Sequence, residues 1–98
     1  MDCNIARFDL VSIRLAVLCA ESGSLSAAAK VAHCSISTGS QRLSALEDFL
    51  GAALFIRDHR GLRLTPAGAV FVQNAYVLLH QLDVLKQEVG SLRDAAIL

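Results

Sequence analysis

The only proline of the chain, Pro66, is followed by a run with the periodicity of one long helix. Thr65 before it is a favourable N-cap, and proline is favoured at the first helical position. An apolar seam with alternating steps of four and three residues needs a partner surface. Near its beginning we expect the seam to pack on the first helix of the same chain, and further along we expect a second copy of the chain to cover it. The seam, and hence the predicted dimerisation surface, consists of Phe71, Ala75, Leu78, Leu82, Leu85, Val89 and Leu92.

Three shorter helices are predicted before this segment, over residues 8–21, 25–32 and 36–50. The first is apolar on nearly every face, so we expect it to be buried on more than one side. Consecutive alanines leave the second with little bulk, so that another helix can approach it closely. The boundaries follow from residues that cap or end helices: Gly23, Ser24, Ser35 and Gly51.

The periodicity changes after the third helix. Short apolar segments over residues 54–57 and 62–65 flank the turn sequence Asp58-His59-Arg60-Gly61, which predicts a β-hairpin. Two helices joined by a tight turn and followed by a hairpin are typical of a helix-turn-helix with a wing. We therefore expect a mainly α fold. Residues 1–65 form a winged helix-turn-helix of three helices and a two-stranded β-hairpin wing, and residues 66–98 form the long dimerisation helix.

The charge of the chain is balanced but unevenly distributed. Nine basic and nine acidic residues give a formal net charge of zero, which counts against nucleic-acid binding in general because phosphate contacts supply most of that affinity. However, Arg57, Arg60 and Arg63 fall within one short segment. The sequence therefore predicts one basic edge, and an affinity for nucleic acid that is modest and strongly dependent on salt.

Several other classes of protein are disfavoured. The apolar stretch over residues 10–20 is interrupted by Ser12 and Arg14 and is too short to span a bilayer, so we expect a cytoplasmic protein with no membrane partner. No phosphate-binding loop, pair of carboxylates or nucleophile triad is evident, so we do not expect an enzyme. No metal or other cofactor is expected either, because the cysteines lack the spacing of metal ligands: Cys3, Cys19 and Cys34.

One ordered set of residues runs along the chain with its spacing intact: Gly23-Ser24-Leu25-Ser26-Ala27-Ala28-Ala29, Ser35, Ser40, Leu43, Leu46, Glu47, Leu54-Phe55, Arg57 and Leu64-Thr65-Pro66-Ala67-Gly68. This set resembles the N-terminal domain of LysR-type transcriptional regulators, and the resemblance extends from about residue 8 to residue 92. The resemblance implies binding to double-stranded DNA as a homodimer through antiparallel linker helices. It also implies a C-terminal effector-binding domain that is absent from this chain, so a small-molecule effector is expected only if such a domain exists.

The third helix is the predicted recognition helix, which would lie in the major groove with its N-terminal half at the base edges. Gln41 is suited to bidentate contact with adenine, hydroxyl groups can contact bases or phosphates, and Arg42 beside them can reach a phosphate. A solvated polar face is the alternative interpretation. The candidate DNA-binding residues of this helix are Ser35, Ile36, Ser37, Thr38, Ser40, Gln41, Arg42 and Ser44.

The wing supplies three further candidates. Arg60 and Arg63 are expected to contact phosphates or the minor groove, with solvated hairpin charges as the alternative. Arg57 resembles the arginine before the wing tip in LysR-type regulators, which contacts the DNA backbone. From the residues alone, Arg57 could instead pair with Asp58 or Glu47.

The chain departs from the family pattern at three places in the third helix. Gly39 stands where a branched aliphatic core residue is usual, so we expect a weakened helix and a cavity there. Ile36-Ser37 replaces Gln-Pro, and Ser40-Gln41-Arg42 replaces Ser-Arg-Gln, so we expect an unusual base preference. The alternative function is a protein-interaction module that forms heterodimers and has weak or lost DNA binding.

Overall fold

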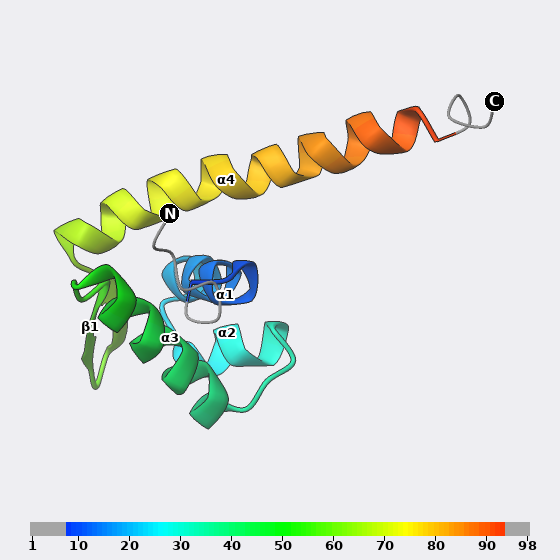
Figure 1. Ribbon diagram of the computed structural model, residues 1–98. Coiled ribbons are helices and arrows are strands. Elements are labelled where there is room, and N and C mark those ends of the chain that lie inside the picture. Colours follow the sequence, from blue (N-terminus) through cyan, green and yellow to red (C-terminus); the bar gives the residue numbers. More distant parts are fainter. Residues whose placement is uncertain (1–7, 94–98) are drawn as a thin grey trace.

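A computed structural model describes residues 8–93, and Figure 1 shows a compact group of short helices and a hairpin beneath one long helix. The expected mainly α winged helix-turn-helix is confirmed. The third helix has the predicted bounds, whereas the other elements differ from the prediction by one or two residues at some ends. The order is α1 (Leu10–Ser22), α2 (Leu25–Val31), α3 (Ile36–Leu50), β1 (Phe55–Asp58), β2 (Gly61–Leu64) and α4 (Pro66–Ser91).

Side-chain caps fix where the helices begin. The Asp9 carboxylate accepts a hydrogen bond from the Ser12 amide, so α1 begins at Leu10 and not at residue 8 as predicted. Phe8 lies outside the helix, and its ring stacks on Phe49 of α3 with 4.9 Å between the ring centroids. The other helices use the predicted hydroxyl caps: Ser24 for α2, Ser35 for α3 and Thr65 for α4.

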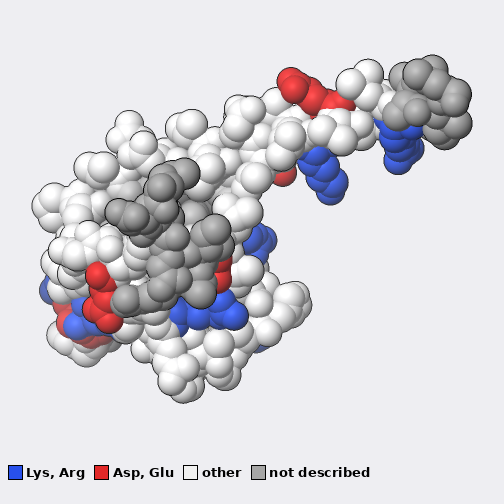
Figure 2. Space-filling view, in the orientation of Figure 1, with Lys and Arg blue, Asp and Glu red and all other residues white. Residues whose placement is uncertain are grey.

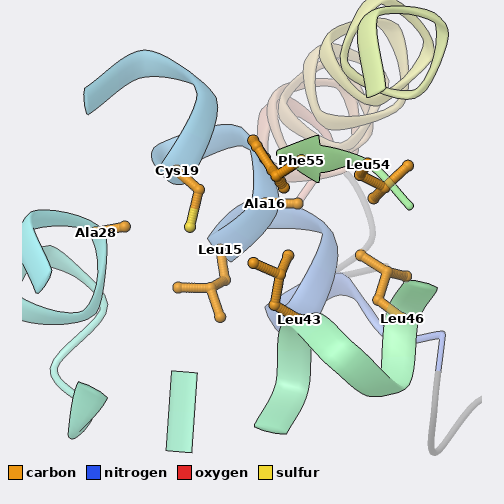
Figure 3. Close-up of a cluster of buried hydrophobic side chains, with 8 residues drawn as sticks. All are labelled: Leu15, Ala16, Cys19, Ala28, Leu43, Leu46, Leu54 and Phe55. Carbon is orange, nitrogen blue, oxygen red and sulfur yellow. The ribbon is translucent and has the colours of Figure 1, made fainter. Parts of the chain in front are cut away.

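The main core lies between α1, α3 and the beginning of the hairpin. Leu15 of α1 and Leu43 and Leu46 of α3 are fully buried, and Figure 3 shows these side chains converging from the two helices. Ala28 of α2, Cys19 of α1, and Leu54 and Phe55 close the cluster. This core holds α3 on one side only, so the opposite side of α3 is left to solvent.

The hairpin is antiparallel, and its pairing extends one residue nearer to the turn than predicted, with Asp58 opposite Gly61. The predicted strands, 54–57 and 62–65, were therefore each displaced by one residue. Gly61 has a φ of 107°, and a Cβ atom there would collide with the backbone carbonyl oxygen of Gly23. The Leu62 amide donates to that same oxygen at 3.0 Å. These contacts seat the hairpin against the turn between α1 and α2.

The long helix α4 packs on α1 over its first half only. Ala75 is buried against Ile13 and Val17 of α1, and Phe71 and Leu79 pack around them. Beyond this contact α4 extends past the rest of the molecule (Figure 1). The predicted division of the chain at residues 65 and 66 coincides with the start of α4, and its outer limits, residues 1 and 98, lie outside the described part.

Candidate nucleic-acid interface

The outward face of α3 carries a row of polar side chains. The buried residues of α3 lie on one face of the helix and are Gly39, Leu43 and Leu46. The opposite face is therefore exposed to solvent. On that face the structure brings together Ser37, Gln41 and Ser44, which are all exposed. An amide and two hydroxyl groups on a helix supported from behind are the groups that read base edges in the major groove.

In the first turn of α3 the hydroxyl groups of Ser35 and Thr38 are hydrogen-bonded to each other, whereas the hydroxyl group of Ser37 is not bonded within the described part of the chain. The Ser35 hydroxyl accepts a hydrogen bond from the Thr38 amide and donates to the Thr38 hydroxyl, both at 3.0 Å. The Ser37 hydroxyl bonds to no other residue of the described chain. Ile36 is 53% exposed although it is apolar. An exposed aliphatic side chain at the N-terminus of such a helix is suited to contact with a thymine methyl group.

Two other predicted residues of α3 flank this face and do not share it. Ser40 is half-buried and lies 3.5 Å from Nη1 of Arg57 in the wing. Arg42, on the other flank, pairs with the Asp9 carboxylate at 3.7 Å. The Arg42 side chain is still 41% exposed, so it can exchange this partner for a phosphate.

Gly39 does not leave the cavity that we expected. A Cβ atom at this position would lie 3.4 Å from Leu25 Cδ1, 3.6 Å from Ala29 Cβ and 3.7 Å from Cys34 Sγ. These are ordinary van der Waals distances, so the neighbours have closed on the glycine. A methyl group therefore fits at this position without displacing its neighbours.

The wing is fixed to α3 by Glu47. One oxygen of this carboxylate accepts from the Leu54 amide at 2.7 Å and from the Phe55 amide at 3.3 Å. The other accepts from Arg57 Nη2 at 2.9 Å. Of the two ion pairs left open for Arg57, the structure contains the one with Glu47.

A single acid lies among the arginines of the wing tip. The Asp58 carboxylate accepts from Arg63 Nη2 at 2.8 Å and lies 3.8 Å from Arg60 Nη2. It also accepts from the Arg60 amide at 2.9 Å. The amide of Arg60, followed by the side chain of Arg63, holds the pKa of Asp58 below its ordinary value. Both arginine side chains stay more than half exposed, and Figure 2 shows acidic and basic groups interspersed.

Sequence reasoning missed two contributors. Glu47 was considered only as a partner for Arg57, although it also binds two backbone amides. Lys30 is exposed in the last turn of α2 and forms no ion pair within the described residues. In a helix-turn-helix the first helix crosses the DNA backbone. The place of Lys30 in the first of these two helices could therefore have marked it as a candidate from the sequence.

The predicted dimerisation seam divides into two parts. Ala75 is buried and Phe71 half-buried in the contact with α1, so these two serve the interior of the chain. Further along α4, the side chains of the seam are less buried by their own chain. Leu82 is half-buried, whereas Leu78, Leu85, Val89 and Leu92 are 41, 55, 62 and 63% exposed.

Two depressions lie in the surface of the described chain. One, of about 410 Å³, lies at the end of α3 and is lined by Glu47, Asp48, Gly51, Ala52 and Ala53. The other, between α1 and α4, is apolar and smaller, at about 110 Å³. Residues 8–93 contain no group of three potential metal ligands and no helix long and apolar enough to cross a membrane. Cys19 is buried, and its burial raises the pKa of the thiol to about 11.

Comparison with known proteins agrees with this arrangement. The model of the bacterial regulatory helix-turn-helix proteins of the lysR family matches residues 10–69. The transcriptional regulator ClcR of Pseudomonas putida is 37% identical over 85% of this chain, and the activator AllS of Klebsiella pneumoniae is 37% identical over 92%. The chain covers 31% and 33% of the lengths of these two relatives.

Solved structures show the same similarity. The crystal structure of CbnR, a LysR family transcriptional regulator, superposes with a TM-score of 0.80 at 31% identity, covering 85% of this chain and 29% of CbnR. The match to the CbnR_DBD-DNA complex covers 90% of this chain and 98% of the CbnR_DBD chain, with a TM-score of 0.76 and 33% identity. The residues matched by the family model, 10–69, include the helix-turn-helix and the hairpin described above. The chain belongs to the lysR family of bacterial regulatory helix-turn-helix proteins.

Proposed function

We propose that this chain binds double-stranded DNA sequence-specifically as a dimeric transcriptional regulator. The observation that carries the proposal is the exposed polar face of α3, with Ser37, Gln41 and Ser44 aligned on a helix that the core supports from behind. Neither the structure nor the relatives offer an observation that favours the alternative of a heterodimerising module without DNA binding. We also propose that the chain is not an enzyme.

In the proposed complex, the N-terminal half of α3 lies in the major groove. Gln41 bonds the edge of an adenine, Ser37 and Ser44 bond bases or phosphates, and Ile36 contacts a thymine methyl group. The free amides at the start of α3 and the Arg42 side chain bind phosphates on either side. Ser35, Thr38 and Ser40 contribute to the same surface by fixing the first turn and the approach of the wing.

The wing and α2 contact the DNA backbone in this proposal. Arg60 and Arg63 are exposed at the tip of the hairpin, and Arg57 lies closer to α3, where Glu47 orients it. Lys30 adds a contact from α2. Solved complexes of CbnR_DBD with DNA and of BenM_DBD with catB site 1 DNA superpose on 90% and 86% of this chain, which supports the proposal that this chain binds DNA.

The dimer forms, in this proposal, through the part of α4 that its own chain leaves uncovered. Leu78, Leu82, Leu85, Val89 and Leu92 continue the stripe beyond the contact with α1. A second α4 would bury them. Residues 1–65 would then be the DNA-binding unit and residues 66–98 the dimerisation unit. A regulator of this kind acts where the bacterial chromosome is, so we propose a cytoplasmic location.

The first experiment selects the preferred DNA sequence. The chain is used to enrich a random duplex library, and fluorescence anisotropy then gives the Kd for the enriched duplex and for a scrambled one. Gln41→Ala should reduce the discrimination between a cognate and an altered adenine by about 1–3 kcal/mol. Arg60→Ala should weaken both duplexes by similar factors.

Matched controls separate these effects from unfolding. Gln73→Ala makes the same change at an exposed position of α4 and should leave both affinities unchanged. The assignment of α3 fails if Gln41→Ala retains the full sequence preference of the parent. For the dimer, Leu85→Glu should shift the sedimentation coefficient to that of a monomer, since Leu85 is 55% exposed and makes little contact within its own chain.

A further inference from the structure

All three arginines of the wing have an acidic partner within the same chain. Arg57 is paired with Glu47, and both Arg60 and Arg63 face the one carboxylate of Asp58. The two carboxylates therefore neutralise part of the positive charge of the three arginines on which the proposed function relies for backbone contacts. This arrangement accounts for the absence of a strongly basic wing in a chain of zero net charge.

The pairing at the wing tip is not required to hold the hairpin together. Exposed ion pairs contribute little to stability, and the Arg63 and Arg60 side chains are 52 and 65% exposed. The hairpin is fixed instead by its backbone pairing, by the close contact of Gly61 with Gly23, and by Glu47. Asp58 therefore affects mainly the charge that the wing presents to a ligand.

We propose that Asp58 attenuates DNA binding: it weakens the contact of the wing with any DNA phosphate and so lowers the affinity for cognate and non-cognate duplexes by similar factors. This inference rests on the proposed function. A phosphate that approaches Arg63 must either displace the carboxylate or lie beside it, and both outcomes cost binding free energy. Non-specific binding depends almost entirely on phosphate contacts, whereas the base contacts of α3 are unaffected by Asp58. Removing the charge should therefore strengthen binding to every duplex by a similar factor.

The test compares the parent chain with Asp58→Asn. Asparagine keeps an oxygen that can accept from the Arg60 amide, so the turn is preserved while the charge is lost. The probes are a random-sequence duplex and the enriched duplex, each titrated by anisotropy over a range of KCl concentrations. One additional phosphate contact steepens the slope of log K against log [KCl] by about 0.9, which is about eightfold in affinity at 0.1 M KCl.

Asp83→Asn is the matched control, because it makes the same charge change at an exposed position of α4 far along the chain from the wing. We expect Asp58→Asn to bind the random duplex about eightfold more tightly with the steeper slope. The affinity for the enriched duplex should rise by a similar factor, so that the ratio of cognate to random affinity is kept, while Asp83→Asn stays close to the parent.

The inference is overturned if Asp58→Asn has the affinity and slope of the parent, or if Asp83→Asn gains as much as Asp58→Asn. In both cases the parent still prefers the enriched duplex and the proposed function stands. If the parent binds enriched and random duplexes alike, the proposed function fails and this inference fails with it. A circular-dichroism spectrum like that of the parent shows that the wing variant is folded.

Discussion

Substitution of Gly39 by alanine should stabilise the protein. Glycine within a helix is about 1 kcal/mol less favourable than alanine, and burial of one methyl group contributes about 0.8 kcal/mol more. The added Cβ would lie 3.4–3.7 Å from three neighbouring atoms, and the closest, Leu25 Cδ1, belongs to a flexible side chain. All three are ordinary contact distances, so little strain opposes these contributions. Because the two contributions are not fully additive, we expect a net gain of about 1–1.5 kcal/mol in the free energy of unfolding.

Urea unfolding followed by far-UV circular dichroism measures this change. Parent and variant are compared at equal chain concentration, because a dimer gains stability with concentration. An unchanged m-value would show that the gain lies in the folded state. Gly90→Ala is the control, since a methyl group there meets nothing within 4 Å and brings at most the helix-propensity term.

Gly39→Val tests the same contacts from the other side. Its extra methyl groups must enter the space occupied by Leu25, Ala29 and Cys34, which should make it less stable than Gly39→Ala by about 1–3 kcal/mol. The reasoning is refuted if valine proves more stable than alanine at this position. That result would mean that a cavity remains beside α3.

Three further outcomes are expected. Asp9→Ala should cost about 1 kcal/mol at neutral pH. The Ser12 amide lowers the pKa of Asp9 below 3.8, so this stabilisation exists above that value and disappears as the pH falls through the lower folded pKa; urea midpoints of parent and variant should converge in acid, and a constant difference would argue against the cap. Cys19→Ala should remove an alkaline loss of stability, because burial raises the thiol pKa from 9.0 to about 11 and the parent loses this contribution as the pH rises through that range; parallel urea midpoints of parent and variant across it would count against the assignment. If Ile36 contacts a thymine methyl, replacement of that thymine by deoxyuridine in the enriched duplex should weaken the parent about fourfold but leave Ile36→Ala unaffected; equal losses would exclude the contact.

The helices could be predicted because the residues next to their ends determine where each helix begins and stops. Ser35 and Gly51 fixed both ends of α3, and Thr65-Pro66 fixed the start of α4. Asp9 was overlooked as the cap of α1 because Phe8 continued the apolar pattern of the helix. That aromatic ring instead leaves the helix to stack on α3.

The polar contacts were less predictable, because they depend on how distant segments meet. Arg57 had two acids within reach along the sequence, and only the fold brings Glu47 to its side chain. The sharing of Asp58 by two arginines depends on the paired hairpin, which places Arg63 diagonally across from Asp58. At Gly39, sequence comparison suggested a missing side chain, but the approach of α2 compensates for it.

Binding of DNA by α3 and the wing can be tested directly by titrating the isotopically labelled chain with the enriched duplex and recording two-dimensional ¹H–¹⁵N NMR spectra. We expect the backbone amide signals of residues 36–44 and 57–63 to move or broaden together, whereas those of Leu15, Ala16 and the buried contact between α1 and α4 stay in place. Changes confined to α4, with the signals of residues 36–44 unmoved at saturating DNA, would show that α3 does not bind the duplex.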